Sequence, residues 1–89
     1  MLFAPIDRLL FPPPVPDGLN VALLNGLAWH MRIYPKWNPE PVLLAARDDG
    51  LWRIEDGRHR VIAAMMAGRL TVLAEQSSNP DLIGGQQHG

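Results

Sequence analysis

The alternation of hydrophobic and polar positions predicts a strand and then a helix in the first third of the chain. Residues 2–10 form a short apolar stretch that Pro5 interrupts. Because proline cannot donate to a strand ladder, we predict an edge strand there. From Leu19 to about Met31 apolar residues return every three or four positions, which predicts an amphipathic helix with Asn20 as its N-cap. Its expected buried stripe is Leu19, Leu23, Leu27 and His30 or Met31, broadened by Leu24 and Ala28.

Two apolar runs in the middle of the chain predict a β-hairpin. The runs cover residues 42–47 and 51–55, and Asp48-Asp49-Gly50 separates them. An Asp-Gly pair between apolar runs is a strong hairpin signal. In the second strand, Trp52 and Ile54 are expected on one face of the sheet, because successive side chains of a strand alternate between faces.

A second helix is predicted directly after Asp56-Gly57, and it ends before Gly68, where a left-handed C-cap is expected. We expect its apolar face to consist of Val61, Ile62, Met65 and Met66, with the two methionines filling the core. The alternation of apolar and polar residues in Leu70–Glu75 predicts a last strand.

The remaining stretches are connectors and a tail. Residues 11–18 are rich in proline and predict a rigid connector. In the loop over residues 33–41, Tyr34 and Trp37 are expected to cover the core or to rim a pocket. After Gln76 the composition is typical of a flexible tail. We therefore expect one domain over residues 1–75, a tail over residues 76–89, and a small α+β fold whose mixed sheet and two main helices follow the order β-α-β-β-α-β.

Composition narrows the classes of function. A chain of 89 residues has room for one small core, and a hydrophobic fraction of 47% argues against a disordered protein. No apolar run approaches the ~20 residues that span a bilayer, and no signal peptide is recognisable at the N-terminus. The absence of cysteine excludes disulfides, thiolate metal ligands and cysteine nucleophiles. We expect a cytoplasmic protein.

The distribution of charge points to one site. The formal net charge of -1 argues against bulk attraction to nucleic acid or to a membrane. Four of the eight basic residues nevertheless lie between positions 53 and 69: Arg53, Arg58, Arg60 and Arg69. Because a helix N-terminus carries partial positive charge and unpaired N–H groups, we predict an anion site at the start of the second helix. A solvated arginine-rich face is the plainer interpretation.

The segment Ile54-Glu55-Asp56-Gly57-Arg58-His59-Arg60-Val61-Ile62-Ala63-Ala64 resembles the ParB/sulfiredoxin superfamily. The similarity consists of Gly57, the His59-Arg60 pair two residues later, an alanine-rich helix that ends at Gly68, and a final strand. The opening segment Ala4–Leu9 also resembles the first strand of ParB N-terminal domains. The resemblance extends over about residues 2–75 and implies a stand-alone ParB N-terminal-like domain.

This resemblance implies that Gly57, Arg58, His59 and Arg60 hold a phosphate group, and that the ligand is ATP or CTP together with Mg²⁺. Three departures are informative. Arg58 stands where a sulfiredoxin has its cysteine, which excludes sulfiredoxin chemistry. The proline stretch lacks the arginine that ParB clamps carry after their first strand, which argues against a CTP switch in particular. The chain has no residues left for the helix-turn-helix domain that follows in a partitioning ParB. Sequence-specific operator binding is therefore not expected.

Three functions remain open at this point. The first is a phosphate-binding module for a nucleotide. The second is nucleotide hydrolysis, phosphotransfer or nuclease activity on the same scaffold, for which Asp7, Glu55 and Asp56 are the candidate catalytic residues. None of them has the spacing of a metal motif, and Asp56 as a helix N-cap or Glu55 as a partner of Arg53 are simpler roles. The third is a noncatalytic module that binds a second copy, another protein or a nucleic-acid backbone.

Overall fold

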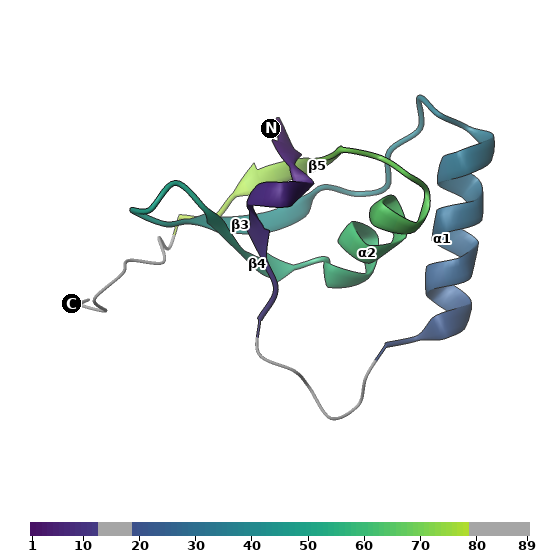
Figure 1. Cartoon of the computed structure of the whole chain (residues 1–89), viewed down its shortest axis with the longest axis horizontal. Helices are drawn as coiled ribbons and strands as arrows, with labels where there is room; N and C mark the ends of the chain where they lie inside the picture. Colours follow the sequence, from purple (N-terminus) through teal and green to yellow (C-terminus); the bar gives the residue numbers. More distant parts are fainter. Residues whose placement is uncertain (13–18, 79–89) are drawn as a thin grey trace.

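The computed structural model describes residues 1–12 and 19–78, and in this part of the chain five strands form one mixed sheet beside two α-helices (Figure 1). The elements follow in the order β1 (Leu2–Pro5), the short 3-10 helix η1 (Ile6–Arg8), β2 (Leu9–Leu10), α1 (Val21–Ile33), β3 (Val42–Ala46), β4 (Trp52–Asp56), α2 (Arg58–Met66) and β5 (Thr71–Gln76). The predicted α+β class is confirmed. The predicted first strand is split, because η1 separates β1 from β2.

The strands lie in the order β1-β5-β3-β4-β2. The predicted hairpin is confirmed as the antiparallel pair β3–β4, and Gly50 in its turn has a φ of 84°. Strand β5 runs parallel to β3 and antiparallel to β1, and β2 runs parallel to β4. Strand β1 lies at one edge of the sheet, as the position of Pro5 predicts.

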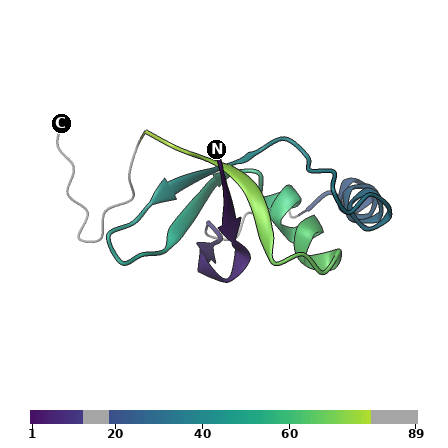
Figure 2. The same ribbon diagram turned by 90° about the horizontal axis from the view of Figure 1, so that it is seen from above.

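The two helices form successive layers over the sheet (Figure 2). Helix α2 lies against the sheet, and α1 packs against α2 on the side away from the strands. Small side chains at the buried positions of α2 allow this close stacking. The core that joins the layers comprises Ala4, Leu9, Leu24, Ala28, Met31, Val42, Leu44, Ile54, Val61, Ala63, Ala64, Val72 and Ala74.

The predicted buried stripe of α1 is wrong in part. Asn20 is the N-cap as predicted, since its side-chain oxygen accepts a hydrogen bond from Leu23 N–H. Of the predicted positions, Leu24, Ala28 and Met31 are buried, whereas Leu19 and Leu23 are exposed. Because α1 has a single helix as its main partner, only a narrow stripe at spacings of four and three is covered.

The predicted core role of the two methionines in α2 is also wrong. Met65 and Met66 are exposed, and Val61, Ala63 and Ala64 are the buried residues of the helix. Since α2 lies between the sheet and α1, its two inner faces accept only small or branched side chains, and the methionines are left on the outer face. Gly68 follows the helix with a φ of 79°, which confirms the predicted left-handed C-cap.

The described part of the chain ends shortly after β5. Strand β5 ends at Gln76, and Ser77 N–H donates to the Leu44 carbonyl at 2.6 Å. The predicted proline connector falls mainly on residues 13–18 and the predicted tail on residues 79–89, which lie outside the described residues. Neither described helix has the length and apolar character needed to cross a bilayer.

Candidate functional site

Gly57 sets how α2 leaves the sheet. It is the N-cap of α2 in the left-handed conformation, with a φ of 102°. A Cβ at this position would lie 2.8 Å from Val42 Cγ1 and 3.2 Å from Val42 Cα. Glycine is therefore required twice, for the backbone conformation and for the close approach of the helix start to β3.

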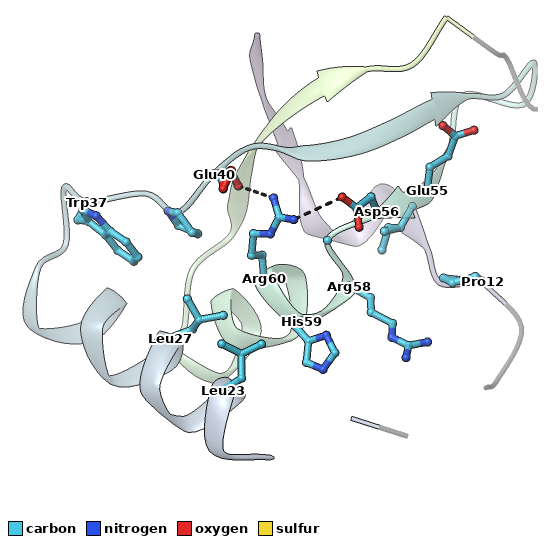
Figure 3. Close-up of a pocket in the computed structure, with 13 residues that line it drawn as sticks. Pro12, Leu23, Leu27, Trp37, Glu40, Glu55, Asp56, Arg58, His59 and Arg60 are labelled. Atoms are coloured by element: carbon cyan, nitrogen blue, oxygen red, sulfur yellow. Dashed lines mark hydrogen bonds and ion pairs between the residues drawn. The ribbon is translucent and has the colours of Figure 1, made fainter. Parts of the chain in front are cut away.

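The start of α2 opens onto a hollow of about 670 Å³, which lies between the two helices, the end of β4 and the loop that leads into β3 (Figure 3). All four predicted phosphate-binding residues line this hollow: Gly57, Arg58, His59 and Arg60. The other lining residues are Pro12, Leu23, Leu27, Trp37, Pro39, Glu40, Ile54, Glu55 and Asp56. Trp37 thus rims a pocket, as predicted.

His59 brings the starts of the two helices together. Its Nε2 accepts a hydrogen bond from Asn20 N–H at 3.0 Å, and Asn20 is the N-cap of α1. This hydrogen bond places the first turn of α2 beside the first residues of α1. The positive ends of both helix dipoles therefore face the same end of the hollow.

The first turn of α2 presents backbone donors at this end. Val61 N–H donates to the Gly57 carbonyl at 3.1 Å and begins the regular helix pattern. The preceding N–H groups of His59 and Arg60 belong to the turn that no helix carbonyl can satisfy. Such a turn suits an anion, and phosphate oxygens in particular.

Arg60 holds a wall of the hollow in place. Its guanidinium donates to the carbonyls of Glu40 at 3.0 Å and Pro41 at 2.7 Å, and it lies 3.5 Å from the Asp56 carboxylate (Figure 3). The side chain therefore links the start of α2 to the loop that leads into β3. A phosphate bound at Arg60 would share the guanidinium with these carbonyls.

The candidate catalytic carboxylates are not gathered in one place. Glu55 and Asp56 line the hollow, but Asp7 lies on η1 and is not among the lining residues. Glu55 pairs with Arg53 at 3.2 Å, as predicted. The predicted N-cap role of Asp56 is wrong, because Gly57 occupies that position. Within residues 1–12 and 19–78, no three His, Asp or Glu side chains are grouped so that they could hold a metal ion.

The four arginines that cluster in the sequence lie at three different places in the structure. Arg58 and Arg60 line the hollow, whereas Arg53 lies along β4. Arg69 donates to Asn38 Oδ1 at 2.9 Å, and to the carbonyls of Met31 at 3.0 Å and Tyr34 at 3.1 Å. It therefore stabilises the C-terminal end of α1 and the loop that follows.

Comparison with solved structures identifies the fold. The chain is similar to the C-terminally truncated chromosome-partitioning protein ParB from Caulobacter crescentus complexed to the centromeric parS site, with a TM-score of 0.73 and 29% identity over 86% of this chain and 40% of that one. The same ParB complexed with CTP-γ-S matches with a TM-score of 0.73 and 29% identity over 90% and 44%. The chain is a ParB-like domain. It spans less than half of each ParB chain. No protein-family model and no curated protein matches it.

Sequence reasoning missed several residues that line the hollow of this ParB-like domain, among them Leu23, Leu27 and Glu40. The predicted buried stripe of α1 includes Leu23 and Leu27. In the structure Leu23 is exposed and Leu27 is half-buried against the core, and both line the hollow. Helical periodicity places them on the inner side of the helix and cannot show that α2 leaves them partly uncovered. No sequence pattern marks Glu40 as a lining residue, because its position depends on the hydrogen bond by which Arg60 holds the loop before β3.

Proposed function

We propose that this ParB-like domain binds the phosphate groups of a nucleotide in the hollow at the start of α2. The observation that carries the proposal is the match over 90% of the chain to a ParB complexed with CTP-γ-S. The hollow adds local support, because Gly57, Arg58, His59 and Arg60 line it together. CTP and ATP are the nucleotides to test first.

The charge balance of the hollow favours a nucleotide that arrives with a cation. Three carboxylates, those of Glu40, Glu55 and Asp56, line the hollow beside Arg58 and Arg60. Mg²⁺ is commonly bound by substrate phosphates together with one or two carboxylates. The Asp56 side chain is 75% exposed and is the carboxylate best placed to share such an ion. In this proposal Mg²⁺ comes with the phosphates.

Two other activities have less support. One of the similar ParB structures is complexed to parS DNA, so a nucleic-acid backbone is a second candidate ligand. It would be recognised by a steep loss of affinity with salt. Hydrolysis, phosphotransfer or nuclease chemistry would need a base near the phosphate. Glu55 and Asp56 are both in ion pairs, and Asp7 does not line the hollow.

Isothermal titration with CTP and with ATP, each with and without Mg²⁺, tests the proposal. We expect binding of at least one nucleotide, and we expect Arg58→Ala to weaken it roughly 5–20-fold, which corresponds to about 1–2 kcal/mol for a charge-assisted hydrogen bond. Arg32→Ala is the matched control, because Arg32 is exposed in the last turn of α1 and does not line the hollow. Absence of nucleotide binding at millimolar concentration, or equal weakening by both variants, would overturn the proposal.

A further inference from the structure

The hollow has two chemically different ends (Figure 3). Arg58 and Asp56 lie at the end formed by the start of α2, and Trp37 lies at the opposite end. Leu23 and Leu27 line the wall between them along α1. Leu23 is 47% exposed and Trp37 is 36% exposed, so apolar surface faces solvent inside the hollow. A ligand that fills both ends must carry charge at one end and apolar surface at the other.

The position of Trp37 is fixed by its neighbours. Its ring contacts that of His30, with 4.3 Å between ring centroids and a tilt of 58°. Its backbone N–H donates to the Tyr34 carbonyl at 3.0 Å. Arg69 also donates to that carbonyl and to the side chain of Asn38, the next residue after Trp37. The indole is therefore held in place before any ligand arrives, which lowers the ordering cost of binding.

We infer that the Trp37 end of the hollow binds a nucleobase, stacked on the indole, while the phosphates lie at the start of α2. This inference rests on the proposed function and makes Trp37 the residue that distinguishes a nucleotide from free polyphosphate. Bases stack well on aromatic side chains because every base has a π-face. The hollow of about 670 Å³ is within the range of small-molecule sites. A purely aliphatic ligand would leave the charged end unused, and inorganic phosphate would leave the apolar end open.

Titration of the whole chain with CTP, ATP and tripolyphosphate distinguishes the contributions of the two ends of the hollow to ligand affinity. We expect the better nucleotide to bind at least about 10-fold more tightly than tripolyphosphate, because only the nucleotide gains stacking. Trp37→Leu should remove this difference and leave the affinity for tripolyphosphate unchanged. Trp29→Leu is the matched control, since Trp29 is exposed on α1 and does not line the hollow. It should change neither affinity.

Tryptophan fluorescence gives a second readout that does not depend on the leucine variant folding. The nucleotide should quench the emission of the wild-type chain, tripolyphosphate should not, and Trp37→Phe should lose the quenching while it keeps most of the affinity. Equal dissociation constants for nucleotide and tripolyphosphate, or quenching that persists in Trp37→Phe, would overturn the inference and leave phosphate binding intact. If neither ligand binds, the proposed function fails and the inference fails with it.

Discussion

Gly57 belongs both to the motif that carries the family resemblance and to the close approach between the start of α2 and β3. The resemblance implies that this residue helps to hold a phosphate, and the structure gives it a second role against β3. Its left-handed conformation and the short distance to Val42 place the first turn of α2 at the edge of the hollow. A glycine in a binding motif can thus be required by the fold whether or not a ligand is bound.

We predict that Gly57→Ala lowers the free energy of unfolding by about 1–3 kcal/mol, because the new Cβ meets Val42 and the φ of 102° is costly for alanine. Gly26→Ala is the matched control. Gly26 lies within α1 with nothing within 4 Å of an added Cβ, so this change should stabilise by about 0.5–1 kcal/mol. Urea unfolding followed by circular dichroism measures both. Two variants of equal stability would contradict this account of Gly57.

At the scale of single residues, the sequence predicts which side chains carry chemistry better than it predicts what they contact. The Gly57–Arg60 segment lines the hollow as a group. By contrast, the partners of Arg60 and Arg69 are mostly backbone carbonyls far along the chain. A carbonyl has the same chemistry at every position, so no sequence pattern marks the ones that an arginine will reach.

The end of α1 depends on Arg69, which comes after α2 in the chain. We predict that Arg69→Lys lowers the free energy of unfolding by about 1–3 kcal/mol, because lysine cannot bridge the three acceptors on Met31, Tyr34 and Asn38 at once. Arg32→Lys, on the exposed side of the same helix end, should change it by less than about 0.5 kcal/mol. Thermal unfolding compares the two, and a neutral Arg69→Lys would show that the capping contacts add little.

The turn of the β3–β4 hairpin should be sensitive to acid. The side chain of Arg47 and the N–H of Leu51 donate to the Asp49 carboxylate and hold the pKa of Asp49 below its ordinary value of 3.8. Because the folded pKa is lowered, the ionised form stabilises the hairpin above pH 3.8, and this contribution is lost as pH falls through the lowered pKa. An NMR titration of the Asp49 carboxyl should show the low pKa, and Arg47→Met should move it towards 3.8. An unchanged titration in that variant would exclude Arg47 as the main cause.

Elements with a local signal were predicted to within a few residues, whereas the buried face of each helix was not. The Asp-Gly turn and the alternation of β5 are properties of neighbouring residues, and both elements formed as expected. Which face of α2 is buried depends on the two layers that cover it. Met65 and Met66 satisfy a helical apolar pattern, yet the side that they occupy has no covering element among the described residues.

At the scale of the whole molecule, the hollow lies between α2 and α1, and α1 is the helix with the fewest contacts to the sheet. Helix α1 packs mainly against α2, and few of its contacts reach the strands. Two polar links supplement that packing, one from Asn20 to His59 at the start of α1 and one from Arg69 to its end. A ligand bound between α1 and α2 would therefore strengthen the attachment of α1 to the domain, because a ligand stabilises the state that binds it.

Hydrogen exchange of the backbone amides tests this arrangement of layers. We predict that amides in the middle of α1, such as that of Ala28, exchange through an opening of lower free energy than amides of Leu44 and Ile54 in the central strands, because one helix interface is easier to break than the sheet. A nucleotide present at 100 times its dissociation constant should slow exchange in α1 by up to about 100-fold, or about 2.7 kcal/mol. The matched comparison is Trp37→Leu, in which tripolyphosphate should still slow α1 but a nucleotide should slow it no further. Equal opening free energies for α1 and the central strands would mean that the domain unfolds as one unit, and the hollow would then not lie between separable layers.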